Sequence, residues 1–411
     1  MIGLAILAAS NRTHAASPVE LGSPLFHPSL AQPIGWRGDG SGRYPAATPV
    51  LEWSATKNVR WSAVVGRGYA SSIVADDAVL VTVEPNRLLC LDRHTGHERW
   101  HVDTAAADLT DEASRTAAAK YRPPKDGSGF AAATPLTDGR NVYVVFANGI
   151  VRAVGLDGRT AWIAWIEAEQ STGYGRSSSP VIVDGKLFVH MTNLYAYDPA
   201  SGKRLWVNSD AKSNYGTPTG LKIGAVQTIV TSAGDVIRTD DGKTLDSGIG
   251  QSGHASPVVK DDVVYYGDTQ ISAVRLSAAF KDKEVWNAML TNDVISSPLL
   301  HDGVFYTNTV KGELSAFDIA SKGSADPLIE ARPLFGGGEG DGPSVYSSLT
   351  LAGKYMFIGS NDGDYVVLEA TRAAKQVAKN SLPAGNGASP FFSGGDMFLR
   401  SGDKLYCIGG P

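Results

Sequence analysis

Short apolar runs alternate with tight polar turns along this chain, and residues 180–207 show the pattern clearly. The runs lie at 180–183, 187–190, 194–198 and 204–207, and the first two are joined by the turn Asp184-Gly185. Glycine in such a turn supplies the positive φ that two-residue hairpins require. Four short strands with tight links predict one four-stranded antiparallel sheet, the unit of a β-propeller blade.

The same frame repeats along the chain, because a signature of small residues, usually followed by proline, opens eight successive copies. The signatures are Ser71-Ser72, Ala133-Thr134-Pro135, Ser178-Ser179-Pro180, Gly216-Thr217-Pro218, Ala255-Ser256-Pro257, Ser296-Ser297-Pro298, Ser347-Ser348 and Ala388-Ser389-Pro390. The second small residue recurs after 62, 45, 38, 39, 41, 51 and 41 residues. A period of about forty residues indicates a repeat array. The sequence therefore predicts an all-β, eight-bladed propeller of four-stranded blades.

A tryptophan occupies a fixed place in the fourth strand of several copies, for example eight residues after Asp92 and eight after Asp198. Such rings could form a platform for a sugar or a cofactor, but their periodicity favours packing between neighbouring blades. The fourth, sixth and seventh copies lack this tryptophan, with Leu245 and Val377 near its place in two of them, and we expect looser junctions there. The tryptophans at this place are Trp100, Trp162, Trp206 and Trp286.

Both cysteines, Cys90 and Cys407, take a place in the third strand that other copies fill with alanine. This position favours two small buried residues, and the alternative is a disulfide between them. The last copy runs out of chain after residue 408 and lacks a fourth strand. Residues 58–65, which include Trp61, resemble that missing strand. We therefore expect the N-terminal strand to complete the last blade and to close the ring without an exposed edge.

The remaining segments do not follow the repeat. Residues 1–16 contain a short apolar run and small residues typical of a signal peptide, although the basic start is missing and an unstructured terminus is the alternative. Residues 17–56 form a Pro/Gly-rich arm, of which 36–40 and 51–53 are expected on the outside of the propeller, which spans 57–411. An insertion at about 105–129 has helical composition from 109 to 121.

Charge and spacing narrow the choice of partners. The net charge of −5 and the absence of a Lys/Arg stripe argue against nucleic acid. The apolar run near the N-terminus is too short to span a bilayer. The eight histidines form no pair with metal-ligand spacing, so we expect no metal site. We also expect a monomer, exported to the periplasm or the cell surface.

The stretch from Ala196 to Trp206 resembles the tryptophan-docking repeat of quinoproteins, and the stretch from Cys90 to Trp100 matches it as well. From about residue 57 onwards the chain looks like the PQQ-binding-like β-propeller repeat family. That family includes pyrroloquinoline quinone (PQQ) alcohol dehydrogenases and the propeller subunit of the outer-membrane assembly complex. The resemblance implies the fold, and it leaves the cofactor open because fold does not fix function.

The quinone dehydrogenases of this family hold PQQ between a tryptophan and a disulfide of adjacent cysteines, and bind calcium through Glu, Asn and Asp side chains. This chain has no adjacent cysteines and lacks the long insertions of those enzymes. No cofactor is therefore expected, and PQQ with calcium remains the alternative.

The loops that lead into the innermost strands should converge on one mouth of the central channel. They carry Arg, Tyr, His and carboxylates among glycines, which is typical of a ligand site, although solvated rim residues would look the same. His254 is the best candidate for acid–base chemistry because its ordinary pKa is near neutrality. The candidate ligand-binding residues are Arg67, Tyr69, Tyr174, Arg176, Tyr215, His254, Asp293, Asp341, Tyr346 and Asn386.

Three functions remain open at this stage. The first is a non-catalytic binding or scaffolding propeller that presents its loops to a protein or glycan of the cell envelope. The second is a quinone-dependent alcohol or sugar dehydrogenase with a divergent pocket. The third is a hydrolase or lyase that uses the Arg/Tyr/His funnel, although spacing alone assigns no Ser/His/Asp order.

Overall fold

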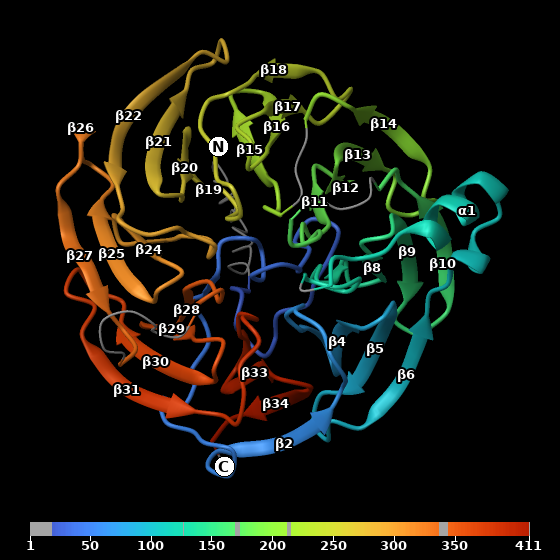
Figure 1. Cartoon of the computed structure of the whole chain (residues 1–411), viewed down its shortest axis with the longest axis horizontal. Helices are drawn as coiled ribbons and strands as arrows, with labels where there is room; N and C mark the ends of the chain where they lie inside the picture. Colours follow the sequence, from blue (N-terminus) through green and yellow to red (C-terminus); the bar gives the residue numbers. More distant parts are fainter. Residues whose placement is uncertain (1–18, 126, 169–172, 212–214, 337–343, 411) are drawn as a thin grey trace, which may run out of the picture.

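The chain forms a ring of eight sheets around a central channel (Figure 1). This computed structural model describes residues 19–125, 127–168, 173–211, 215–336 and 344–410. Each sheet contains four antiparallel strands, stacked side by side in order from the channel to the outer edge. The predicted eight-bladed, all-β propeller is therefore confirmed.

Seven blades take their four strands from one stretch of chain. Blades one to four comprise β3 (Ile73–Ala75), β4 (Ala78–Val83), β5 (Arg87–Asp92) and β6 (Glu98–Asp103); β7 (Leu136–Thr137), β8 (Asn141–Val145), β9 (Ile150–Gly155) and β10 (Thr160–Trp165); β11 (Val181–Val183), β12 (Lys186–Met191), β13 (Asn193–Tyr197) and β14 (Arg204–Asn208); β15 (Thr219–Ile223), β16 (Val226–Val230), β17 (Val236–Arg238) and β18 (Thr244–Asp246).

Two blades in the second half of the ring carry a short extra strand, β26 (Gly323–Ser324) on blade five and β1 (Arg43–Tyr44) on blade seven. The regular strands of blades five to eight are β19 (Val258–Lys260), β20 (Val263–Tyr266), β21 (Gln270–Leu276) and β22 (Asp282–Met289); β23 (Leu299–His301), β24 (Val304–Asn308), β25 (Glu313–Asp318) and β27 (Pro327–Pro333); β28 (Thr350–Ala352), β29 (Tyr355–Gly359), β30 (Asp364–Glu369) and β31 (Gln376–Ser381); β32 (Phe391–Ser393), β33 (Asp396–Ser401), β34 (Lys404–Ile408) and β2 (Val59–Val64).

The two ends of the propeller domain meet in blade eight. Strand β2 pairs antiparallel with β34, and Trp61 lies opposite Cys407 (Figure 1). The N-terminal strand thus supplies the fourth strand that the C-terminal repeat lacks, as the sequence predicts. This pairing completes blade eight and closes the ring, so the exposed sheet edges of an open array are avoided.

The small-residue signatures form a closed ring of hydrogen bonds around the channel. The backbone N–H of one residue in each signature donates to the hydroxyl of the equivalent residue in the next blade, at 2.9–3.3 Å. The ring contains Ser71, whereas the repeat pattern of the sequence aligns Ser72 with the other copies. That alignment is wrong by one residue, because Ser72 stands in the place that proline takes in most blades. The ring residues are Ser71, Thr134, Ser179, Thr217, Ser256, Ser297, Ser348 and Ser389.

The tryptophans of the fourth strands pack against the next blade, as predicted. In four blades the indole Nε1–H donates to a backbone carbonyl of the next blade at 2.8–3.0 Å. The ring also covers a glycine of that blade, where an added Cβ would lie 2.4–3.1 Å from the indole. The glycine is thus required for close approach as well as for its turn. The pairs are Trp61 with Gly96, Trp100 with Gly158, Trp162 with Gly202, and Trp206 with Gly242.

The cysteines lie directly opposite two of these tryptophans, Cys90 across from Trp100 and Cys407 across from Trp61. Both thiols are free and buried, and burial raises the pKa of Cys90 to about 12. The prediction of small buried residues is confirmed, and the disulfide alternative is wrong. A small side chain is needed here because the indole fills the space on the facing strand.

In the blades without a docking tryptophan, the strand register shows which residue takes its place. Asp246, Ile329 and Ala378 fill the docking place in these blades, opposite Val236, Ala316 and Val367 of the third strands. Leu245 and Val377 stand one residue earlier, at the bulge that precedes this place in each fourth strand. The looser packing expected at these junctions stays a prediction.

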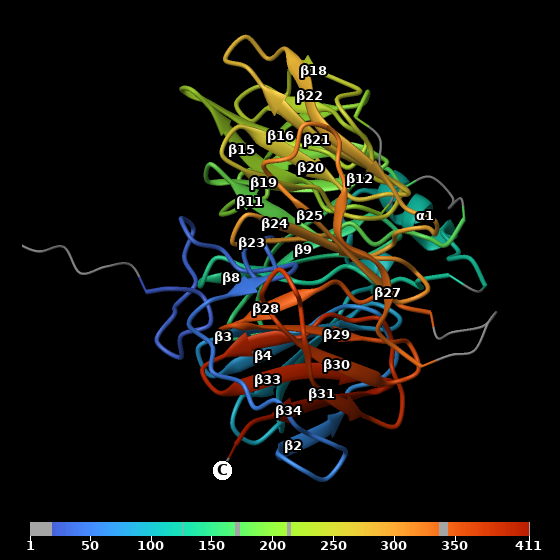
Figure 2. The ribbon, with the colours of Figure 1, turned by 90° about the vertical axis from the view of Figure 1, so that its left-hand side faces the viewer.

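The N-terminal arm does not lie on the outside of the propeller, as residues 36–40 were expected to. It crosses one face of the disc and enters the channel (Figures 1 and 2). Strand β1 adds in parallel to the innermost strand β28 of blade seven, and Ile34 bridges to Thr137 at the inner edge of blade two. Arg37 is 3% exposed. The inner edges of the blades offer unpaired backbone groups, which the arm satisfies.

Trp53, also expected outside, is buried at the junction of blades seven and eight. Its ring stacks on Phe357 at 6.1 Å and contacts Tyr365 at 5.9 Å. Its backbone N–H donates to the side chain of Asn380 on the outermost strand β31. The arm therefore delivers a tryptophan to a blade whose own fourth strand has Ala378 at the docking place.

The insertion after blade one contains a 3-10 helix η1 (Ala106–Asp108) and the helix α1 (Glu112–Lys120). Asp111 caps α1 by accepting a hydrogen bond from the Ser114 backbone N–H. Leu109 and Ala118 pack on Ile150 of blade two. No helix among the described residues is long and apolar enough to cross a membrane.

Candidate binding site at the channel mouth

The two ends of the channel differ in what covers them. The arm occupies one face, and the insertion with α1 lies toward the opposite face (Figure 2). At that opposite face the chain enters each innermost strand, and we call this end the mouth. The described loops of the mouth are residues 65–70, 130–133, 173–178, 215–216, 251–255, 291–296, 344–347 and 383–388.

Three tyrosines of the mouth are exposed to solvent. Tyr174 is 67% exposed, Tyr69 is 47% exposed and Tyr346 is 41% exposed. They come from the loops that lead into blades three, one and seven. Among the large side chains that are exposed in the described part of the chain, these three are the aromatic ones. The exposed tyrosine surface of the described chain is therefore concentrated at the mouth.

Tyr215 and His254 form a second aromatic feature, between the loops that enter blades four and five. Their ring centroids lie 4.7 Å apart and the planes are inclined by 32°. The Tyr215 hydroxyl also accepts a hydrogen bond from the Tyr174 backbone N–H at 3.1 Å. Three candidate residues from three successive loops are thus brought together by direct contacts.

The two candidate arginines have different environments. Arg67 is exposed, and its carbonyl accepts a hydrogen bond from the backbone N–H of Glu84. Arg176 is only 3% exposed, and its carbonyl lies 3.5 Å from the Ser128 hydroxyl that donates to it. Arg176 therefore belongs to the wall beneath the loops, and Arg67 to the surface.

The other candidates sit in the loops of blades six to eight. The Asp293 carboxylate accepts a hydrogen bond from the Thr269 hydroxyl at 3.2 Å. The Asn386 amide donates to the carbonyl of Gly68 at 3.2 Å, which links the loops of blades eight and one. Asp341 lies outside the described residues.

The sequence reading missed two charged groups beneath the mouth. The Glu84 carboxylate accepts hydrogen bonds from the backbone N–H groups of Phe130 and Ala131, and burial raises its pKa. The Arg400 guanidinium is fully buried and donates to the carbonyls of Gly66 and Thr82. Burial lowers the pKa of Arg400 to about 10. An arginine inside the apolar strand β33 was the signal in the sequence.

The candidate residues of the mouth make hydrogen bonds and one ring contact. Within the described part of the chain, His254 has no hydrogen bond to a serine or cysteine that it could activate. No group of three or more His, Cys, Asp or Glu among those residues could hold a metal ion. The exposed tyrosines and the polar loop groups of the mouth are kinds of side chain that line ligand sites.

Comparison with known families gives a decisive match. A family model described as "Outer membrane protein assembly factor BamB" matches residues 53–239 and 218–325, more than half of the chain. The chain belongs to this family of PQQ-like β-propellers. The resemblance derived from the tryptophan-docking repeats is thereby confirmed. A search among curated proteins found no sequence match.

Several solved structures share the fold. BamB from Moraxella catarrhalis has a TM-score of 0.57 at 11% identity, over 86% of this chain and 99% of that one. A quinohemoprotein alcohol dehydrogenase from Comamonas testosteroni gives 0.58 at 13%, over 92% and 81%. The computationally designed Ika8 protein gives 0.56 at 11%, over 88% and 100%. These neighbours differ in kind, so their likeness shows the fold alone.

The described residues do not fit the quinone site that the resemblance describes. Cys90 and Cys407 are buried in strands β5 and β34, and they are not neighbours in the sequence as the cysteines of the quinone site are. Four of the tryptophans have their Nε1 bonded to the next blade, and the ring of Trp286 is fully buried. Trp165, at the end of β10, donates to the carbonyl of Asn148. None of these rings stands free to cover a planar cofactor.

Proposed function

We propose that this protein is a non-catalytic binding propeller whose mouth recognises a protein or glycan partner of the cell envelope. The observation that carries the proposal is the gathering of Tyr69, Tyr174 and Tyr346, all exposed, around one end of the channel. Tyrosine combines a large apolar face with a hydroxyl, and such residues dominate recognition surfaces. The Tyr215–His254 pair and the surface Arg67 extend the same face.

The experiment is capture from an envelope extract by the immobilised full chain, together with a glycan array. Replacing all three exposed tyrosines by alanine should weaken binding of the recovered partner by about 2 kcal/mol or more, as for hot-spot aromatics. The matched control replaces Leu205, Leu328 and Val377, which are exposed on outermost strands, and should bind like the parent. Loss of binding in the control but not in the tyrosine variant would refute the mouth as the binding surface.

The second part of the proposal concerns the cellular location of the protein. The family description refers to the outer membrane, and residues 1–16 have the apolar run and small residues of a signal peptide. We propose export to the periplasm or the cell surface as a monomer. Fractionation of the native host and light scattering of the purified protein test these two points, and recovery in the cytoplasmic fraction would refute export.

The second candidate is a quinone-dependent alcohol or sugar dehydrogenase, which the fold shared with a quinohemoprotein alcohol dehydrogenase favours. Purified protein would be soaked with PQQ and calcium, and dye reduction would be followed with alcohols and sugars. We expect no spectral shift and no dye reduction. Substrate-dependent reduction would replace the binding proposal by the enzymatic one.

A further inference from the structure

The channel already contains one buried cation, and its contacts define a binding geometry. Nη2 of Arg37 donates to the carbonyl of Pro298 at 2.8 Å and to the carbonyl of Leu349 at 3.1 Å, with a longer contact of 3.4 Å to the carbonyl of Ser41 in the arm. Pro298 and Leu349 directly follow the ring residues Ser297 and Ser348 of two adjacent blades. The protein thus uses a pair of neighbouring channel carbonyls to hold a guanidinium group.

The strand register explains why these carbonyls face the channel. In blade six the hairpin closes at the pair His301 and Val304. Pairs in an antiparallel ladder alternate between hydrogen-bonded and non-hydrogen-bonded. His301 and Leu299 therefore form hydrogen bonds to β24, whereas the backbone groups of Leu300 and Pro298 point to the opposite side. The carbonyl of Pro298 is on this free side.

The same register recurs in blades three and four. Their hairpins close at Val183 with Lys186 and at Ile223 with Val226. By the same alternation, the carbonyls of Pro180 and Pro218 face the channel. No hydrogen bond to either carbonyl occurs within the described residues. These two blades therefore repeat the pair of acceptors that holds Arg37, without a cation on it.

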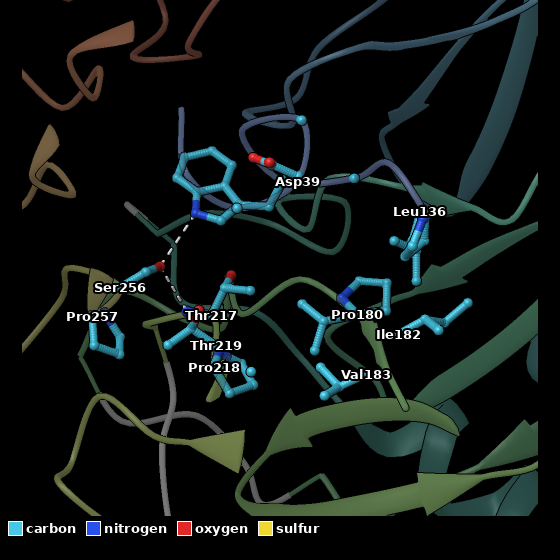
Figure 3. Close-up of a pocket in the computed structure, with 17 residues that line it drawn as sticks. Asp39, Leu136, Pro180, Ile182, Val183, Thr217, Pro218, Thr219, Ser256 and Pro257 are labelled. Atoms are coloured by element: carbon cyan, nitrogen blue, oxygen red, sulfur yellow. Dashed lines mark hydrogen bonds between the residues drawn. The ribbon is translucent and has the colours of Figure 1, made fainter. Parts of the chain in front are cut away.

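A cavity of about 70 Å³ lies at this second pair (Figure 3). Its walls include Pro180, Pro218 and Pro257 from three adjacent blades, and Trp36 and Asp39 from the arm. This is several times the space that one water needs by the same measure, so the cavity has room for a small planar head group.

The arm holds two groups beside this cavity in defined orientations. Nε1 of Trp36 donates to the Ser256 hydroxyl at 3.2 Å, which fixes the indole ring. Oδ1 of Asp39 accepts from the backbone N–H and the hydroxyl of Ser41, at 3.0 and 2.6 Å. Oδ2 of Asp39 has no hydrogen bond among the described residues. An aromatic face and a carboxylate are the groups that bind an organic cation.

We infer that this cavity binds a guanidinium group, supplied by an arginine side chain of a protein partner or by a small guanidinium compound. The carbonyls of Pro180 and Pro218 accept its N–H groups, Asp39 balances its charge, and Trp36 covers its face. Asp39 also lies close enough to Arg37 to favour the charged form of that residue. Asp39 would then share its negative charge between Arg37 and the bound guanidinium, which weakens its attraction for the ligand. We therefore expect a dissociation constant in the millimolar range. This site is on the face opposite the mouth and is independent of the function proposed above.

The test is calorimetric titration of the full chain with N-acetyl-arginine methylamide, its citrulline counterpart and its lysine counterpart. The arginine probe should bind, and the neutral citrulline probe, which has nearly the same shape, should not. Soaked crystals should show the head group between Trp36 and Pro218. Asp39→Asn should weaken binding of the arginine probe at least about tenfold, which corresponds to ~1.4 kcal/mol.

Asp157→Asn is the matched control, because exposed Asp157 also accepts a backbone N–H two residues ahead, from Arg159. It should bind like the parent. Equal affinity for arginine and citrulline, or unchanged binding by Asp39→Asn, would overturn the inference, and an equally tight lysine probe would refute a guanidinium site. The citrulline comparison needs no variant, so it decides even if Asp39→Asn fails to fold. Tighter binding of an arginine-containing tripeptide than of the single residue would identify a protein side chain as the source.

Discussion

The backbone N–H of Ser389 donates a hydrogen bond of 3.1 Å to Oγ of Ser71, which lies 318 residues earlier in the chain. This bond joins blade eight to blade one at the wall of the channel. It is the last of the eight bonds between adjacent signature residues. The ring is therefore closed twice, at the channel by these serines and at the outer edge by the pairing of β2 with β34.

Ser71→Ala should destabilise the protein, because the buried N–H of Ser389 loses its acceptor. An unsatisfied buried donor costs about 1–3 kcal/mol. Urea unfolding of the variant and the parent measures the difference. Ser72→Ala is the control, since the Ser72 hydroxyl is buried without a partner among the described residues, so its loss leaves no buried group unsatisfied and should cost much less than Ser71→Ala. Equal stability of the two variants would contradict the role of the hydroxyl ring.

Gly96→Ala should destabilise the closure between blades eight and one. An added Cβ would lie 2.5 Å from Cε3 of Trp61, and we expect about 1–3 kcal/mol for this crowding beyond the cost of the positive φ. Gly303→Ala is the control, because its φ of +75° is close to the +71° of Gly96 but no atom lies within 4 Å of the added Cβ. It should cost only about 1–2 kcal/mol. If the two alanine variants had the same unfolding free energy, close docking of Trp61 would be refuted.

Trp53→Ala should open a cavity at the junction of blades seven and eight, where the arm ring packs on Phe357 and Tyr365. Removal of a buried tryptophan side chain costs about 3–5 kcal/mol. The melting temperature should fall clearly. Leu25→Ala, also in the arm but 67% exposed, should melt like the parent. A small effect of Trp53→Ala would mean that the arm does not stabilise this junction.

Stability should fall between pH 7 and pH 5 because of His190. Burial lowers the pKa of His190 to about 4, and the pKa in the unfolded chain is about 6.5. The unfolded state therefore binds more protons below pH 6.5, and the loss of stability grows until the pH reaches about 4. Linkage gives about 2 kcal/mol at pH 5.

The measurement is the unfolding free energy of the parent and of His190→Gln at both pH values. The variant should lack this part of the pH dependence, since Gln keeps a donor for the carbonyl of Ala211 but does not titrate. Exposed His97→Gln should keep the dependence of the parent. The same pH dependence in the parent and in His190→Gln would contradict the prediction.

The number of blades and the closure of the ring could be read from the chain because each depends on a local, repeated pattern. Each blade has a small hydroxyl residue at the channel and a tight first hairpin, and five of the eight also have an indole opposite a small residue such as Cys90. These features recur at similar spacings in successive repeats, so one clear repeat is enough to identify the others. The error of one residue at Ser72 arose because two serines are adjacent there, and only the hydrogen-bond geometry distinguishes them.

The candidate residues at the mouth were reached through the same frame, which places their loops but not their side chains. Tyr174 and Arg176 are two residues apart, yet one is exposed and the other is buried. The insertion lies against this loop, since Ser128 donates to the backbone carbonyls of both Tyr174 and Arg176. Burial of this kind depends on segments that are distant in sequence, so periodicity does not reveal it.

The sequence by itself determined the propeller, the family and the strand that closes the ring, because these follow from short-range patterns repeated eight times. Only the tertiary structure decided the path of the arm, the burial of Arg37 and the cavity beside Trp36. The arm has no repeat and little regular pairing of its own. Its position is set by the carbonyls and open inner edges of blades that come together only when the ring has formed.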